Sequence, residues 1–132
     1  MTIYVKAHIG RLSAMCACAI AASIGVGAGT SFLMGDGLEQ IGMTVKNLVG
    51  SIGGILCDGA KFGCAMKLSS AAGIAIESAQ LAHEGVCIPD RDGLVCTSAD
   101  ETIAMLGRIA ANGMLYTDEY MCKEIIDRES AL

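Results

Sequence analysis

The chain has 132 residues, a typical length for one domain, and we expect residues 1–132 to form a single domain. Hydrophobic residues make up 53% of the sequence and the net charge is −5, so the composition lacks the basic footprint of a nucleic-acid-binding protein. Seven cysteines are an odd number in an apolar chain with one proline. This count argues against a secreted disulfide framework and favours free thiols in the cytoplasm.

Apolar spacing and turn signals predict an all-α fold, compact and rich in alanine and glycine. Helices are predicted over residues 6–23 with a resumption up to residue 33, and over residues 38–49, 65–84, 98–113 and 117–128. The glycine-rich GVGAG, residues 25–29, is expected either to break the first helix or to let another helix pack closely. Gly85 is expected to end the long helix predicted over residues 65–84.

Local signals also mark the later helix starts and one non-helical stretch. Ser98 and Glu101 form an S-x-x-E capping box, and Thr117 precedes acidic residues that suit a helix N-terminus. One short hairpin or loop excursion is expected near residues 86–96, where an Asp-Gly pair predicts a turn.

Residues 12–34 carry no charge and follow Arg11, so their length alone would suit a signal peptide or a membrane span. Alanine, glycine, serine and cysteine dominate this stretch, and these residues insert weakly into a bilayer. We therefore expect a buried core helix and no membrane partner, while a small membrane-anchored protein is kept as an alternative.

Two cysteine motifs are the main candidates for chemistry. CDGAKFGC contains Cys57 and Cys64 on a glycine-rich stretch, and CACAIAAS contains Cys16 and Cys18. Thiolates on irregular backbone can converge on a bulky inorganic core, and a nearby cation such as Lys61 would stabilise them. A C-x6-C pair by itself also fits free thiols that are simply buried in a core.

The longer stretch GGILCDGAKFGCAMKLSSA resembles the signature of the L-cysteine desulfidase family, whose relatives include the α-domain of iron–sulfur L-serine dehydratases. Further blocks that resemble the family follow its order along the chain: CACAIAAS, FLMGDGLEQI, DGLV, ADETIAMLGRIAANGM and TDEYMCKEII. The resemblance covers nearly the whole chain. It is specific because several separate blocks agree in order.

The resemblance implies a lyase that uses a [4Fe–4S] cluster with one open iron and needs no pyridoxal phosphate. In that family three cysteines hold the cluster, and sulfide or water is lost from L-cysteine or L-serine to give pyruvate and ammonia. Carried over to this sequence, the metal and cofactor ligands would be Cys16, Cys57 and Cys64, with Cys18 as the alternative to Cys16.

The resembled enzymes are roughly three times longer, and this chain resembles only their C-terminal, cluster-binding part. We therefore expect an N-terminal half or partner subunit, or self-association, beside a small amino-acid substrate. The alternative function is a non-catalytic subunit or fragment that lacks a competent cluster. The sequence also has Phe62 where the family commonly has proline and Ser23 where glycine is usual.

Other polar residues near the motifs are candidates for catalysis. Lys61, Asp58 and Lys67 flank the proposed ligands and are the expected catalytic residues. His8 is a weaker candidate for a general base, and His83 lies at a helix end, where the helix dipole favours a cation. The remaining cysteines are expected to be core or incidental thiols: Cys87, Cys96 and Cys122.

Overall fold

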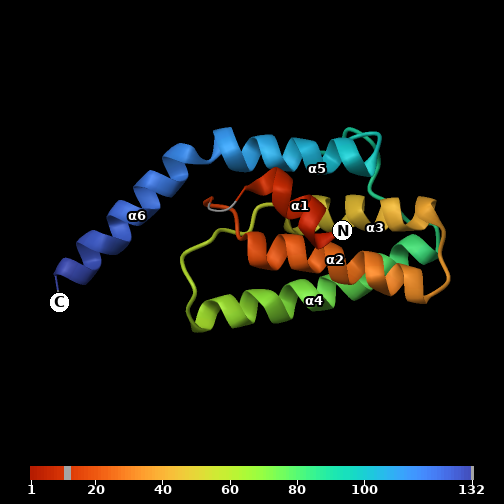
Figure 1. The fold of residues 1–132 in the computed structure, drawn as a ribbon, viewed down its shortest axis with the longest axis horizontal. Coiled ribbons are helices and arrows are strands. Elements are labelled where there is room, and N and C mark those ends of the chain that lie inside the picture. The colour runs from red at the N-terminus through yellow and green to blue at the C-terminus, as the bar shows by residue number, and fades with distance from the viewer. Residues whose placement is uncertain (11–12, 132) are drawn as a thin grey trace.

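The structure is a computed structural model that describes residues 1–10 and 13–131, and within these ranges it is all-helical, as predicted (Figure 1). Arg11, Leu12 and Leu132 lie outside the described residues. The helices are α1 (Thr2–Ile9), α2 (Ala17–Leu33), α3 (Leu38–Ile52), α4 (Phe62–His83), α5 (Ala99–Arg108), the π-helical η1 (Ile109–Gly113) and α6 (Leu115–Ser130).

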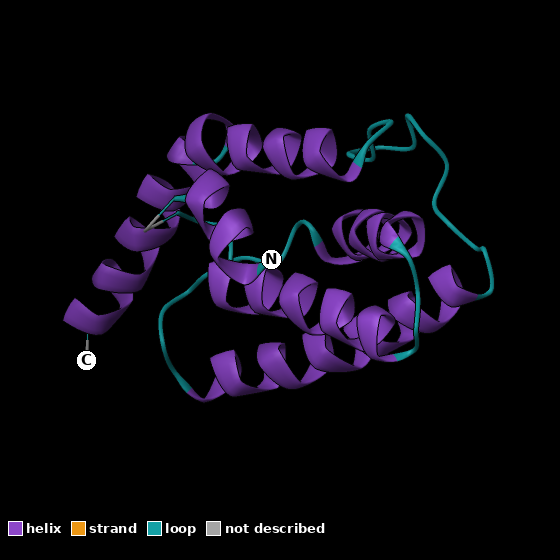
Figure 2. Cartoon of the chain, turned by 45° about the vertical axis from the view of Figure 1, so that its right-hand side comes forward, coloured by secondary structure: helices purple, strands orange, loops and turns teal. Residues whose placement is uncertain are grey.

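The core lies where α2, α3 and α4 pack against one another, with α1 and α5 covering one side of α2 and α3 (Figures 1 and 2). Five helices contribute fully buried aliphatic side chains to this core, among them Val5, Ile20, Ile24, Val45, Leu48, Ala75, Ile103 and Leu106. By contrast, α6 projects from the body and none of its residues is buried. The molecule is therefore a packed helical body with one exposed terminal helix.

The first helical segment differs from its prediction because the break falls earlier in the chain. Gly10 has φ +89° and ends α1, whereas α2 runs without interruption through the glycine-rich residues 25–29. Gly25 and Gly27 serve close packing instead, whereas Gly29 faces open space. A Cβ at Gly27 would lie 2.7 Å from Leu48 Cδ1, and one at Gly25 would lie 1.9 Å from Thr2 Oγ1.

The expected burial of the stretch around α2 is confirmed for one face of the helix. Ile20 and Ile24 are fully buried, whereas Phe32 and Leu33 at its C-terminal end are exposed. In the described part of the chain, no helix combines the length and the apolar character needed to cross a membrane.

The start of α5 and the end of the helical run formed by α5 and η1 follow the sequence signals, whereas the start of α6 does not. Ser98 and Glu101 form the predicted capping box, with the Glu101 amide donating to Ser98 Oγ at 3.1 Å. The helical run ends at Gly113 after the π-helical turn. Met114 alone connects the π-helical turn to α6. Helix α6 therefore begins at Leu115, and Thr117 lies inside its first turn.

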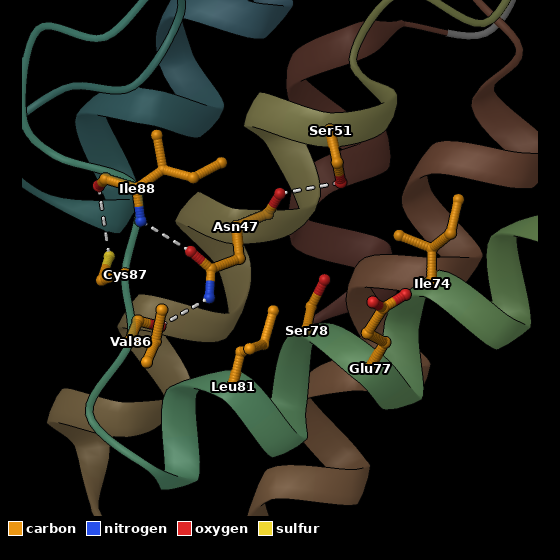
Figure 3. Close-up of a pocket in the computed structure, with 9 residues that line it drawn as sticks. All are labelled: Asn47, Ser51, Ile74, Glu77, Ser78, Leu81, Val86, Cys87 and Ile88. Atoms are coloured by element: carbon orange, nitrogen blue, oxygen red, sulfur yellow. Dashed lines mark hydrogen bonds between the residues drawn. The ribbon is translucent and has the colours of Figure 1, made fainter.

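A hairpin or a loop is predicted near residues 86–96. The structure has a loop there and no hairpin. The Asn47 amide of α3 holds this loop (Figure 3). Its Nδ2 donates to the Val86 carbonyl at 2.9 Å, and its Oδ1 accepts from the Ile88 amide at 2.8 Å. Asn47 is 5% exposed, so both bonds are largely shielded from water.

We expect Asn47→Ala to lower the free energy of unfolding by about 1–3 kcal/mol, because it leaves two shielded backbone groups without a partner. Urea unfolding measures the change. Ser51→Ala is the matched control, since the Ser51 hydroxyl only donates to carbonyls of its own helix and its loss should cost much less. Equal losses in the two variants would contradict the role of Asn47.

His83 at the end of α4 pairs with Asp36, which lies in the turn between α2 and α3. His83 Nδ1 lies 2.6 Å from Asp36 Oδ1, and Ser31 Oγ donates to Asp36 Oδ2 at 2.6 Å. The hydrogen bond and charge of Asp36 raise the pKa of His83, whereas hydrogen bonds from Ser31 and His83 lower the pKa of Asp36.

The signs of these shifts predict a pH-dependent stability. The raised pKa of His83 gives a contribution that is complete below about 6.5, the unfolded value, and is lost as pH rises through the folded value. The lowered pKa of Asp36 adds stability above about 3.9, which is lost as pH falls through its folded value.

We therefore expect His83→Gln to destabilise the chain more at pH 5.5 than at pH 8.5, as measured by urea midpoints at both pH values. His8→Gln is the control, because His8 Nδ1 contacts a backbone carbonyl, that of Tyr4, instead of a carboxylate. A His83→Gln effect that is the same at both pH values would contradict this assignment.

Candidate metal centre

A short backbone pairing brings the two cysteine motifs together. Met15 and Leu56 form an isolated antiparallel β-bridge. On either side of it, the Cys57 amide donates to the Ala14 carbonyl at 2.6 Å and the Cys16 amide donates to the Ile55 carbonyl at 2.8 Å. The bridge thus holds Cys16 and Cys57 on neighbouring segments that are about forty residues apart in sequence.

The third predicted ligand is placed by the loop that follows the bridge. Gly59 has φ +98°, a left-handed conformation that favours glycine, and it redirects the chain towards α4. Cys64 lies in the first turn of α4, where its amide donates to the Lys61 carbonyl at 2.9 Å. In Figure 1 this loop descends on the same side of the molecule as the start of α2.

All four motif cysteines line one small cavity of about 70 Å³. The residues around it come from the α2 N-terminus, the loop and the α4 N-terminus: Cys16, Cys18, Cys57, Asp58, Gly59, Ala60, Cys64 and Lys67. The structure therefore brings together every ligand candidate of the sequence, including both alternatives for the third ligand, and two of the three catalytic candidates.

Two features of the cavity act in opposite directions on a negatively charged thiolate: nearby helix N-termini stabilise it, and burial destabilises it. The N-termini of α2 and α4 both border it, and helix N-termini stabilise anions through their unpaired amides. Cys16 is only 2% exposed, and burial raises the pKa of its thiol, with smaller contributions from the nearby Cys57 and Cys64. A positively charged group in the cavity would relieve this cost.

The four thiols line one cavity, but among the described residues no group of three or more His, Cys, Asp or Glu side chains is close enough to hold a metal ion. Cysteine thiolates are the usual ligands of iron–sulfur clusters, so the chemistry of the donor set fits such a cluster.

Lys67 and Asp58 form an ion pair at the edge of the cavity. The Lys67 ammonium also donates to the Leu56 carbonyl at 2.9 Å, so it ties the bridge and the loop to α4. The hydrogen bond between the two side chains lowers the pKa of Asp58 and raises that of Lys67. Both groups are thereby held in their charged forms.

The other catalytic candidates lie elsewhere. Lys61 does not line the cavity, and its Nζ lies 3.4 Å from Glu129 Oε1 on α6, with both side chains exposed. His8 is on α1, where its ring makes an edge contact with Tyr4, and it does not line the cavity either. Phe62, at the start of α4, is 96% exposed.

The three remaining cysteines are separate from this site, and all seven are free thiols. Cys87 lines a mostly apolar cavity of about 340 Å³ between α3, α4 and the 86–88 segment, and burial raises its pKa (Figure 3). Cys96 is half-buried, and Cys122 is exposed on α6.

Sequence reasoning did not find this cavity or the role of Asn47. The available signal was a polar amide within an apolar face, between Val45 and Leu48.

The family match agrees with this geometry. Residues 1–123 match the family described as serine dehydratase alpha chain, and the chain belongs to that family. The resemblance to the α-domain of serine dehydratases is thus confirmed. No solved structure shows a significant match to the chain.

More particularly, the chain is similar to bacterial UPF0597 proteins. It is 42% identical to one from Desulfotalea psychrophila over 123 residues, 93% of this chain and 28% of the relative. It is 43% identical to one from Desulfatibacillum aliphaticivorans over 129 residues, 98% of this chain and 29% of the relative. The Clostridioides difficile relative is 44% identical over 127 residues, 96% of this chain and 30% of that protein. The chain therefore spans less than a third of the length of these relatives.

Proposed function

We propose that the chain is the cluster-binding part of a [4Fe–4S]-dependent lyase that converts L-cysteine or L-serine to pyruvate and ammonia without pyridoxal phosphate. The observation that carries this proposal is the single cavity lined by four thiols at the N-termini of two helices. Membership of the serine dehydratase alpha chain family supports it. The free thiols fit a reducing compartment, and we propose the cytoplasm.

The proposed ligands are Cys16, Cys57 and Cys64. Cys16 and Cys57 are held beside each other by backbone hydrogen bonds, which fixes their spacing before any cluster binds. Cys64 faces the same cavity from the first turn of α4. Cys18 remains the alternative to Cys16. It is exposed, and a thiol on the first turn of α2 has more freedom to reorient than the buried Cys16.

When bound, the cluster would supply an open iron that acts as a Lewis acid on the leaving group at Cβ of the substrate. The chain's own contribution is binding and orientation. An ammonium group has three N–H donors, and Lys67 uses two of them on Leu56 and Asp58. We assign the third to the substrate carboxylate.

The other two catalytic candidates have weaker roles. Asp58 is a poor proton acceptor because its pKa is lowered, so we assign it to positioning Lys67. Lys61 follows Ala60, which lines the cavity, but its ammonium would have to leave Glu129 to reach a substrate.

The relatives are more than three times the length of this chain, so most of the substrate pocket is proposed to lie in the part that this chain does not cover. Catalysis needs the amine and carboxylate held in line with a base, and few groups at this cavity can do that. We propose a partner segment that supplies them. A non-catalytic subunit that keeps the fold is the competing function, and loss of the cluster would favour it.

The test is anaerobic reconstitution with iron and sulfide, followed by metal analysis and a pyruvate-release assay with L-cysteine and L-serine. We expect about four iron and four sulfide per chain and the visible absorbance of such a cluster. We also expect turnover by the chain alone to be low. A chain that retains no iron would overturn the lyase proposal and leave the non-catalytic subunit. Full turnover by the isolated chain would show that its own residues complete the pocket.

A further inference from the structure

Helix α4 carries few charged residues, and the described structure covers only one of its sides. Its 22 residues include just two side chains of fixed charge, Lys67 and Glu77. The buried residues lie on one face, towards α2 and α3: Ala71, Ala75, Ser78, Ala79 and Ala82. The opposite face carries exposed apolar side chains that no element of the described structure covers: Phe62, Met66 and Ile76.

That opposite face forms a continuous strip, which we call the outer seam. Its residues recur at intervals of four and three along the helix: Phe62, Met66, Ser69, Gly73, Ile76 and Gln80. This spacing places them on one side of the helix over about 27 Å. Phe62, Met66 and Ile76 are 96%, 70% and 46% exposed, and the seam contains no charged side chain.

The shape of the outer seam suits a second helix. Small residues, Ser69 and Gly73, lie at its middle between bulkier ends, and a Cβ built on Gly73 meets nothing within 4 Å. Such a depression lets another backbone approach closely while the ends make side-chain contacts. Figures 1 and 2 both show α4 at the edge of the molecule, with no other helix outside it.

We infer that the outer seam is the docking surface for the part of the longer UPF0597-type protein that this chain does not cover, through an apolar helix of that part. This inference rests on the proposed function only in treating the chain as one piece of a larger enzyme. The seam begins at Phe62, two residues before Cys64. Residues two apart on a helix point to opposite sides, so a helix docked on the seam would lie across α4 from the cysteine cavity.

The size of the seam favours this occupant over a second copy of the chain. A strip of six side chains is small beside the 20–30 residues per side of a typical stable interface. A larger partner can extend beyond the seam. The Lys61–Glu129 pair brings the end of α6 to the start of α4, and Ile126 on that end of α6 is 60% exposed. The missing part of the relatives, more than twice the length of this chain, is large enough to cover both surfaces.

The experiment uses Gly73→Arg, with Gly29→Arg as a matched control. Both glycines lie inside helices with open space at Cβ, so neither substitution should disturb the chain itself, and arginine forms helix better than glycine. Each variant is made in the isolated chain and in a chimera, the intact C. difficile relative with its 127 matched residues replaced by this chain.

In the isolated chain we expect no loss of thermal midpoint for either variant. In the chimera we expect Gly73→Arg to lower it by about 5 °C or more, and Gly29→Arg to leave it within a degree or two. Equal midpoints for the two chimera variants, or a chimera without a cooperative transition, would overturn the inference. None of these measurements needs iron, so failure of cluster loading leaves this result unaffected.

Sedimentation velocity of the isolated chain tests the other occupant. We expect any self-association to be insensitive to Gly73→Arg. A dimer that this substitution abolishes would identify the occupant as a second copy and overturn the inference.

Discussion

Cys57→Ser and Cys64→Ser should each reduce the iron and sulfide retained after anaerobic reconstitution to near zero, whereas Cys96→Ser should load like the unsubstituted chain. Cys57 and Cys64 face the cavity from the two ends of one loop, and an alcohol at either position is a far weaker ligand for iron than a thiolate. Cys96 is a half-buried thiol outside the cavity whose Sγ lies 3.7 Å from the Leu94 carbonyl, so it controls for the chemical change alone.

Circular dichroism of the unloaded variants separates ligand loss from misfolding. Helical content should be the same in all three, because the backbone hydrogen bonds of Cys57 and Cys64 do not involve their side chains. Retained iron in Cys57→Ser would refute the ligand assignment. Loading of Cys16→Ser compared with Cys18→Ser then decides the third ligand, and we expect the larger loss at Cys16.

Gly107→Ala should cost the chain about 1–3 kcal/mol of unfolding free energy, as expected for overpacking in a closed contact. A Cβ at Gly107 would lie 2.6 Å from the carbonyl oxygen of His8 and 2.9 Å from its carbonyl carbon. Both are backbone atoms of α1, so the clash cannot be relieved by turning a side chain. Helix α1 would have to move away from α5.

Gly29→Ala is the matched comparison, because it makes the same chemical change in a helix where Cβ meets nothing within 4 Å. Alanine forms helix better than glycine by up to about 1 kcal/mol, so this variant should be as stable as the parent or more so. In urea unfolding, Gly107→Ala is thus expected to lower the free energy of unfolding, and Gly29→Ala is expected to leave it unchanged or raise it. A gain in stability for both would show that α1 and α5 pack less closely than the structure indicates.

Much of the fold follows from local sequence signals. The capping box at Ser98 and Glu101 forms as written, because its two hydrogen bonds join residues three apart and need no other element. The helix predicted over residues 38–49 is correct in position and extends to Ile52. Cys57 and Cys64 could be singled out by their glycine-rich motif, whereas Cys16 and Cys18 are singled out by the resemblance to the family.

Other features depend on contacts that local patterns do not contain. The uninterrupted course of α2 through residues 25–29 is stabilised by packing against α1 and α3, which outweighs the poor helix propensity of glycine. The bridge between Met15 and Leu56 joins segments that no short motif relates. Lys61 illustrates the same limit, because its position in the motif suggested a catalytic role while its side chain turns to Glu129 of a distant helix.

Helix α6 is attached to the rest of the molecule mainly at its two ends. This helix is about 24 Å long and packs mainly against the π-helical Ile109–Gly113 at one end, while at the other end Glu129 reaches Lys61. An exposed ion pair is weak and is screened by salt. Rising ionic strength would then release the far end, which would pivot about the π-helical turn and swing away from the cysteine loop.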